Sequence, residues 1–443
     1  MLKLVTVSKR LFAFVMALPL LLTGCSVEVN LDTLLTPPKL SAQQEQIYQA
    51  LQDTTGSEIQ LKYPKRGNYL SAFIVADIDG DTGEEAIVFY EKSGLPSQDA
   101  GLRINVLDCI NGEWLSICDR SAEGSEIEKV VLSPLGGNDR MNVIVGYSTA
   151  NQSEKYISVY SYSDGYLDQT FSHSYALFDV AETGSGESNP DLILLGAATS
   201  PEFSAYAAVY RLAEDGRYHE FKYNFRDSYT DYSQLIYGTL SDGKVAIYVD
   251  AATGTSSLQT EILCMESTQL SNLLERCSHV AGDTVRRAGL ACMDIDGDQI
   301  PEVPVQNVFL GYENADESEQ IRQTRWLMLK EPRFYTEHYS YYSANNGYVF
   351  ILPEEWENHV TAVNDTTAGE LRFVAYNGTW EDQMQILLRV YIAYDEADLN
   401  EHLSAGYHLI RTKGTANYLV KSESGQELSQ NIGNIIPCFR FLD

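Results

Sequence analysis

The chain has 443 residues, 44% of them hydrophobic, which is enough for two or three domains with sizeable cores. It carries 62 acidic side chains against 31 basic ones, a formal net charge of −31 at pH 7. Because this balance repels phosphate backbones, nucleic acid is excluded as a partner class. The same acidic surface favours solubility and attracts cations.

The first 24 residues have the pattern of an export signal. Three basic residues precede an apolar run over residues 11–22, shorter than the roughly 20 residues of a membrane-spanning helix. The following Leu22-Thr23-Gly24-Cys25 resembles a bacterial lipobox, which implies cleavage before Cys25 and lipid on that residue. We therefore expect a signal peptide over residues 1–24, a tether over residues 25–40, and a membrane-anchored protein on the extracytoplasmic face. Without the lipobox, the apolar run would be a short membrane anchor.

Six cysteines follow Cys25, and none of them lies in a Cys-x-x-Cys pair, so a zinc site is not expected. Cys109 and Cys118 flank a predicted hairpin turn, which leaves a disulfide open. The alternative is that all six are buried as small apolar side chains.

A helix is expected to begin after Ser41, because Gln44 stands three residues later and completes a capping box. Ile47, Ala50 and Leu51 then share one helical face, and the helix ends by Gly56.

From about residue 60, the chain repeats a unit of about fifty residues. Five strand-like runs recur at spacings of 49 to 58 residues: 86–90, 143–147, 192–196, 245–249 and 303–308. Three hairpins are expected to turn at Asn111-Gly112, Asp164-Gly165 and Asp215-Gly216, dipeptides that tolerate positive φ. Since two independent markers share one period, the pattern predicts the four-stranded blades of a β-propeller.

Two loops in this array contain the sequence Asp-Ile-Asp-Gly-Asp. Carboxylates occupy loop positions one, three, five and nine: Asp77, Asp79, Asp81 and Glu85 in the first loop, and Asp294, Asp296, Asp298 and Glu302 in the second. This spacing suits Ca²⁺, which takes six to eight oxygen ligands, better than Mg²⁺, which resists losing its waters. Neither loop is an EF-hand, because position six is Thr82 or Gln299 instead of glycine. The alternative is a pair of ordinary solvated turns.

The four-stranded unit with an Asp-rich loop between its first two strands resembles the FG-GAP/VCBS repeats of integrin-like bacterial β-propellers, over about residues 60–340. The resemblance implies that both loops bind Ca²⁺ in a structural role through these eight carboxylates. Three other units depart from the pattern. The second has Pro134, Gly136, Asn138 and Asn142 at the ligand positions, and the fourth is shortened around residues 241–243, so neither is expected to hold metal. The third keeps Asp179 and Asp191 and is left open.

Beyond residue 342 the repeat pattern ends. Strands are expected at 348–352, 370–376, 384–394, 407–411 and 418–421, and a helix over 395–404. The segment 352–356 resembles C-terminal domains of Gram-positive lipoproteins. We therefore expect a mainly β fold, with a helix and a propeller of five or more blades over residues 41–342 and an α+β domain over residues 343–443.

No catalytic motif is present: the sequence contains no Gly-x-Ser-x-Gly, no phosphate-binding Gly-rich loop and no His-x-x-x-His pair among its seven histidines. We therefore expect a calcium-binding propeller that serves as a binding or scaffold module, without catalysis, for a protein or a cell-envelope glycan. The alternative is an enzyme, or an accessory of one, that acts on polysaccharide or peptidoglycan. The 29 tyrosines are either a stacking surface for such a partner or half-buried strand residues.

Overall fold

The computed structural model describes residues 40–442, apart from residues 57, 82, 93–100, 138–139, 151–153, 185–188, 201–202, 241, 267, 278–283, 331, 382, 424 and 426. The expected signal peptide, most of the tether and the lipidation site at Cys25 lie outside the described residues. Within the described part, every helix is too short or too polar to cross a membrane.

The described chain begins with helix α3 (Ala42–Thr55), as predicted. The Ser41 hydroxyl accepts the Gln44 N–H at 3.2 Å and the Gln44 side chain accepts the Ser41 N–H at 3.0 Å, which confirms the capping box. Ile47 and Leu51 are fully buried and pack α3 against the first sheet.

The described residues form six antiparallel sheets that follow the order of the chain. The first contains β1 (Ile59–Leu61), β2 (Phe73–Ala76), β3 (Glu85–Lys92), β4 (Arg103–Ile110) and β5 (Glu113–Ser121). The second contains β6 (Glu126–Ser133), β7 (Asn142–Ser148), β8 (Lys155–Ser163) and β9 (Tyr166–Ser174). The third contains β10 (Leu177–Ala181), β11 (Asp191–Gly196), β12 (Tyr206–Leu212) and β13 (Tyr218–Asn224).

The fourth sheet contains β14 (Tyr232–Thr239), β15 (Val245–Ala252), β16 (Ser257–Glu266), β17 (Gln269–Asn272) and β18 (Arg286–Arg287). The fifth contains β19 (Val303–Val308), β20 (Arg322–Lys330), β21 (Arg333–Ser343), β22 (Tyr348–Ile351) and β28 (Phe439–Phe441). The sixth contains β23 (Val360–Asp365), β24 (Glu370–Ala375), β25 (Ile386–Ala393), β26 (His408–Lys413) and β27 (Ala416–Ser422). The remaining helices are α4 (Glu396–Ser404), α5 (Ile432–Ile435) and the short 3₁₀ turns Leu273–Arg276, Glu354–Trp356 and Ile436–Cys438.

The five strands predicted from the repeat are β3, β7, β11, β15 and β19, which confirms a mainly β chain built of repeated antiparallel sheets of four or five strands. Two of the predicted turns are two-residue hairpins, with Asn111 at φ +56° and Asp164 at φ +52°. The third is a longer loop, because Leu212 pairs with Tyr218 across it.

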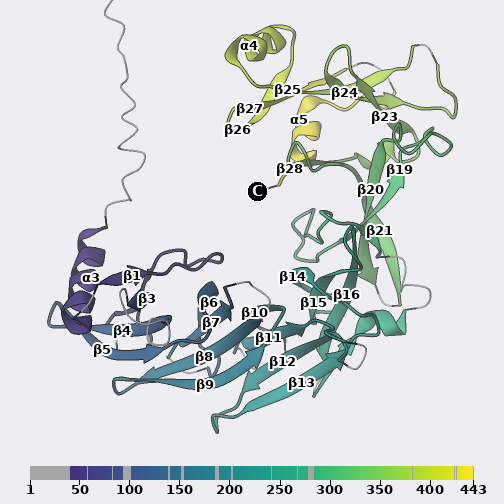
Figure 1. Cartoon of the computed structure of the whole chain (residues 1–443). Coiled ribbons are helices and arrows are strands. Elements are labelled where there is room, and N and C mark those ends of the chain that lie inside the picture. Colours follow the sequence, from purple (N-terminus) through teal and green to yellow (C-terminus); the bar gives the residue numbers. More distant parts are fainter. Residues whose placement is uncertain are drawn as a thin grey trace, which may run out of the picture.

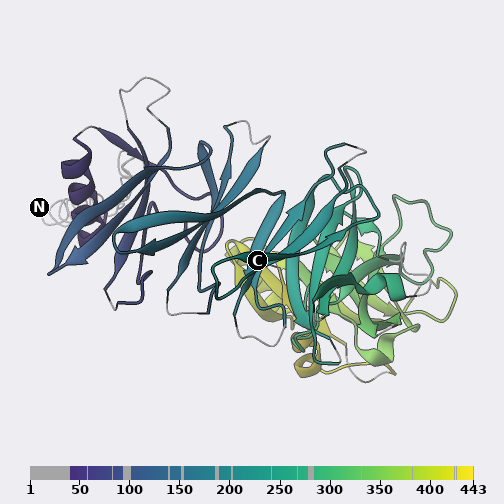
Figure 2. The same ribbon diagram turned by 90° about the horizontal axis from the view of Figure 1, so that it is seen from below.

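Consecutive sheets pack on one another through shared apolar cores. Representative pairs across the five junctions are Phe89 with Tyr147, Ile157 with Leu194, Val209 with Val249, Tyr248 with Leu327, and Phe350 with Phe373. The sheets lie along an open arc, and its two ends, the first sheet with α3 and the last with α4, stay apart in both views (Figures 1 and 2). Repeated antiparallel sheets like those of a propeller are therefore present, whereas the described residues do not form a closed wheel.

The predicted domain boundary at residue 343 does not separate two domains in the structure. It falls in the hairpin between β21 and β22, where Ser343 pairs with Tyr348, and β28 adds to the same sheet from the end of the chain. The core shared by the fifth and sixth sheets contains Phe309 as well as Phe373. Residues 343–443 therefore complete the fifth sheet and build a sixth one, instead of forming an independent unit. The predicted helix is present as α4, with Asp395 as its N-cap.

Cys109, Cys118, Cys292 and Cys438 carry free thiols. Across the β4–β5 pair, Cys109 lies opposite Trp114 and Cys118 lies opposite Val106, so the two thiols are not juxtaposed.

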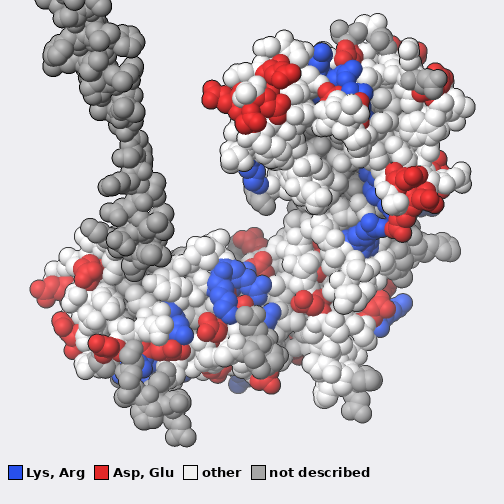
Figure 3. Space-filling view, turned by 45° about the horizontal axis from the view of Figure 1, so that its top comes forward, with Lys and Arg blue, Asp and Glu red and all other residues white. Residues whose placement is uncertain are grey.

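The acidic surplus is unevenly distributed over the surface. On the face in Figure 3, Lys and Arg side chains gather in a patch near the middle, while acidic side chains are scattered around it. The charge of any one site must therefore be read from its own residues.

Candidate metal centres

The two Asp-rich loops are the same hairpin placed in two different sheets. In the first sheet, the loop joins β2 to β3, and Ala76 pairs with Glu85 across its base. In the fifth sheet, an isolated bridge pairs Met293 with Glu302 just before β19. Both loops therefore have the same length, and a glutamate ends each of them, Glu85 as the first residue of β3 and Glu302 directly before β19.

The loops are closed by hydrogen bonds from backbone N–H groups to the carboxylates. Asp77 accepts the Gly80 N–H and Asp294 accepts the Gly297 N–H, each at 2.7 Å. Both glycines have positive φ, 82° and 91°, a conformation that the tight turn requires and that glycine adopts without strain.

The glutamates are the most enclosed carboxylates of the two loops. Glu85 is 1% exposed and accepts the Ile78 N–H at 2.8 Å. Glu302 is 0% exposed and accepts the Ile295 N–H at 3.0 Å. The other oxygen of Glu302, Oε1, is buried and has no hydrogen-bond partner among the described residues.

Six of the eight predicted ligands are brought together. Carboxylate oxygens of Asp77, Asp79 and Glu85 lie within 4.8 Å of one another, and so do those of Asp294, Asp296 and Glu302. The structure does not place Asp81 and Asp298 in these groups. Asp81 Oδ1 accepts the Gly83 N–H and Asp298 Oδ1 accepts the Ile300 N–H, each at 2.7 Å, which directs these side chains to the backbone.

Burial and mutual repulsion shift the pKa values of these groups. Burial, together with the neighbouring carboxylates, raises the pKa of Glu85 to about 7 and that of Glu302 to about 8. Burial also raises the pKa of Asp79. Burial pushes the pKa of Asp296 upward too, but the hydrogen bonds from His338 and from the Asp298 N–H outweigh it and leave that pKa below its ordinary value.

Two residues near the loops were not predicted from the sequence. Asp108 on β4 lies opposite Glu85, and its charge contributes to the raised pKa of Glu85. His338 on β21 places Nε2 at 3.0 Å from Asp296 Oδ2. Both come from other strands, so no spacing pattern within the loops signals them.

The groups fit a hard cation such as Ca²⁺. Each offers carboxylate oxygens only, which are the ligands that Ca²⁺ prefers. The orphaned Glu302 Oε1 is a buried acceptor, and burying an unpaired acceptor is costly. A cation held by Asp294, Asp296 and Glu302 would satisfy that oxygen and offset the burial and the repulsion that raise the pKa of Glu302.

Other sheets also have a buried polar residue where their second strand begins, as the first sheet does with Glu85. These residues are satisfied by different partners. In the second sheet, the neutral Asn142 accepts the Leu135 N–H at 3.2 Å, as the two glutamates do in their loops. In the third sheet, Arg211 Nε and Nη2 bind the two oxygens of Asp191 at 2.9 and 2.8 Å. Asp179 instead pairs with Lys129 at 2.7 Å, so the two candidate ligands of this sheet are not brought together.

The sixth sheet compensates its buried carboxylate in the same way as the third sheet. Its Glu370 begins β24 and binds Arg372 Nε at 2.7 Å and Arg389 Nη1 at 3.0 Å. A guanidinium thus supplies the positive charge in the third and sixth sheets. In the first and fifth sheets, the contacts of Glu85 and Glu302 with the described residues include no basic side chain.

The raised pKa values predict how stability varies with pH in the absence of metal. An unfolded glutamate ionises near its ordinary pKa of 4.5, whereas folded Glu302 holds its proton up to about pH 8. Because the folded state then binds more protons, the free energy of unfolding in EDTA falls as the pH rises from about 5 to about 8. Glu302→Gln keeps an oxygen for the Ile295 N–H but carries no charge, so it reduces this fall when unfolding is followed by calorimetry.

The matched control for this measurement is Glu214→Gln, which changes an exposed residue in the β12–β13 loop. We expect this variant to show the same pH profile as the parent protein. A Glu302→Gln profile that is indistinguishable from the parent in EDTA contradicts the prediction.

No family model and no curated protein matches the chain. Solved structures that resemble it include a rhamnogalacturonan lyase of Bacillus licheniformis, with 11% identity, a TM-score of 0.31 and 75% of each chain covered. Sqt1 of Saccharomyces cerevisiae has 8% identity, a TM-score of 0.31 and covers 68% of this chain and 72% of its own. A protein from Lactobacillus plantarum has 9% identity, a TM-score of 0.27 and covers 74% of this chain and 96% of its own. Similarity at this level assigns neither a family nor an activity.

Proposed function

We propose that the protein is a lipid-anchored, extracytoplasmic scaffold whose row of β-sheets is stiffened by Ca²⁺ and presents a binding surface to a protein or a cell-envelope glycan. The observation that carries the calcium proposal is the pair of three-carboxylate groups, each within 4.8 Å. It is supported by the buried Glu302 oxygen that has no partner among the described residues. The lipid anchor rests on the lipobox resemblance at Cys25.

Each loop lies at a joint between two consecutive sheets. Ile78 is fully buried in the core shared by the first and second sheets, and its carbonyl accepts the Met141 N–H at 3.1 Å. In the second loop, the Gln299 carbonyl accepts the Thr239 N–H of β14 in the fourth sheet at 3.0 Å. A cation that orders the loops would thus help to hold neighbouring sheets in a fixed orientation. In a closed propeller the ring itself fixes that orientation, whereas an open arc lacks this constraint.

We favour binding over catalysis because of where the carboxyl groups with raised pKa values lie. Apart from the two loops, burial raises the pKa of Glu261, which is 6% exposed. Its oxygens accept hydrogen bonds from Tyr229 at 2.5 Å and Asn272 at 2.6 Å, so it is a satisfied core residue. A general acid or base must reach a substrate, and this group does not.

Calcium is expected to stabilise the soluble protein that begins after Cys25. If Ca²⁺ exceeds Kd by about 10- to 100-fold, each site adds roughly 1.4–2.7 kcal/mol by mass action. Calorimetry in EDTA and then in Ca²⁺ should show a higher Tm with Ca²⁺. The double variant Asp79→Ala with Asp296→Ala, which removes one carboxylate from each group, should abolish the shift.

The control is Asp242→Asn, which removes an exposed carboxylate from the corresponding turn of the fourth sheet. It should leave the calcium-induced shift unchanged. If the parent protein melts at the same temperature in EDTA and in Ca²⁺, the calcium part of the proposal fails.

A further inference from the structure

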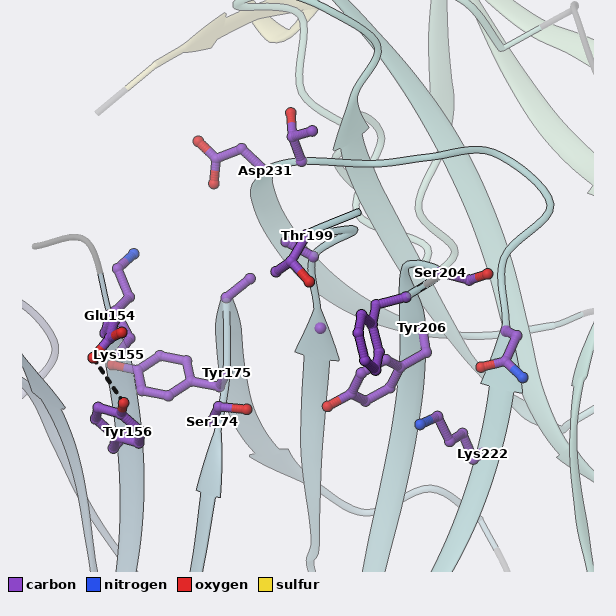
Figure 4. A pocket seen from close by; sticks show the side chains of 16 residues that line it. Glu154, Lys155, Tyr156, Ser174, Tyr175, Thr199, Ser204, Tyr206, Lys222 and Asp231 are labelled. Carbon is purple, nitrogen blue, oxygen red and sulfur yellow. Dashed lines mark hydrogen bonds between the residues drawn. The ribbon is translucent and has the colours of Figure 1, made fainter. Parts of the chain in front are cut away.

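A groove of about 800 Å³ lies across the second and third sheets. One wall comes from β8 and β9, with Tyr156 and Ser174, and the other comes from β12 and β13, with Tyr206 and Lys222 (Figure 4). The loop before β12 contributes Phe203 to the lining. Pockets of this size hold small organic ligands or short segments of a polymer.

Aromatic rings form the apolar part of the groove. The backbone fixes the positions of two of them, Tyr206 and Phe203. Tyr206 lies over Gly196 of the neighbouring strand, where a Cβ would come within 2.1 Å of its ring. Lys222 Nζ lies 3.7 Å from the centre of the same ring. Phe203 is 67% exposed, and its N–H is bound to the Ser200 carbonyl at 3.1 Å. An exposed phenyl ring in a groove wall offers a flat apolar face to a ligand.

The polar part of the groove is rich in hydrogen-bonding groups and locally neutral. Neutral donors and acceptors are supplied by Ser174, Thr199, Ser204, Asn224 and Thr230. The charged lining residues are two lysines, Lys155 and Lys222, and two acids, Glu154 and Asp231. These four charges cancel, although the whole chain carries −31. The groove therefore offers no net complementary charge to a polycation or a polyanion.

We propose that this groove binds a short, uncharged oligosaccharide; the proposal rests on the proposed function as a binding module and names its ligand class. The ring of a sugar has an apolar face of C–H groups and a polar rim of hydroxyls. The first matches the Phe203 ring, and the second matches the surrounding hydroxyl, amide and charged groups. An apolar peptide would leave most of these polar groups without partners.

The test is isothermal titration calorimetry on the calcium-loaded soluble protein. The probes are tetramers of β-1,4-linked glucose and of β-1,4-linked N-acetylglucosamine. We expect at least one of them to bind, with an affinity that does not change between low and high salt because the ligand is uncharged. Phe203→Ala should weaken that binding by about tenfold, since it removes the stacking face.

The matched control is Tyr166→Ala, which removes an equally exposed aromatic side chain, 70% exposed, from the second sheet outside the groove. It should leave the affinity unchanged. Failure of both tetramers to bind, an affinity that Phe203→Ala leaves unchanged, or binding only of the anionic polymer polygalacturonate with loss at high salt overturns the proposal. A calcium-dependent Tm without sugar binding would refute the groove proposal alone, whereas sugar binding without a calcium effect would refute the calcium proposal alone.

Discussion

Replacing Arg286 by Met is expected to lower the free energy of unfolding by about 3–5 kcal/mol. The Arg286 and Asp250 side chains are both 0% exposed, and Arg286 Nη2 lies 2.6 Å from Asp250 Oδ1. Without the guanidinium, the Asp250 carboxylate remains in the core of the fourth sheet with no positive partner. A buried charge that loses its counter-charge is among the most destabilising changes in a protein.

The same ion pair positions the chain just ahead of the second Asp-rich loop. Asp250 Oδ2 accepts the Cys292 N–H at 2.8 Å, and the Met293–Glu302 bridge follows at the next residue. Arg286→Met should therefore weaken the calcium-induced rise in Tm as well as the overall stability. Urea unfolding and calorimetry measure the two effects separately.

Two further variants sharpen this experiment. Arg286→Met combined with Asp250→Asn removes both charges and should cost less than Arg286→Met alone, because no unpaired charge remains. Arg217→Met removes a guanidinium that is 83% exposed and pairs with Asp215, so it should change stability by no more than about 0.5 kcal/mol. A loss below about 1 kcal/mol for Arg286→Met would contradict the assigned role of the pair.

Replacing Trp356 by Ala is expected to cost about 3–5 kcal/mol. Trp356 is 0% exposed in the core shared by the fifth and sixth sheets, where its ring centre lies 5.9 Å from that of Phe350 and 6.0 Å from that of Phe373. Its indole N–H donates to the Leu428 carbonyl at 2.8 Å. The substitution therefore leaves a large cavity and an unpaired carbonyl.

This variant also tests the organisation of the last hundred residues. Because β22 and β28 belong to the fifth sheet, we expect the fifth and sixth sheets to melt together, with Trp356→Ala lowering the Tm of that joint transition. Trp380→Ala, at a side chain that is 48% exposed, is the control and should have a much smaller effect. A separate transition for residues 343–443, moved alone by Trp356→Ala, would restore the domain boundary at residue 343.

Much of the local structure could be predicted from the sequence. Runs such as 86–90 and 143–147 became the buried strands β3 and β7, because their β-branched and aromatic residues favour strands. Asn111-Gly112 and Asp164-Gly165 formed two-residue turns, because these residues accept positive φ. The pairing of β22 with β28, which lies at the far end of the chain, had no local signal. Without that pairing, the sequence predicts a separate domain over residues 343–443.

The sequence by itself determined where the carboxylates of the two Asp-rich loops lie along the chain. A hairpin of constant length sets their spacing, and the backbone N–H groups of the loop orient Asp77 and Asp294 locally. Only the tertiary structure decided which buried acids lack a positive partner. Glu85 lies opposite Asp108, whereas Asp191 is bound by Arg211, and each neighbour comes from another strand. A buried charge is compensated only by groups a few ångströms away in space, and strand pairing, not spacing along the chain, determines which groups those are.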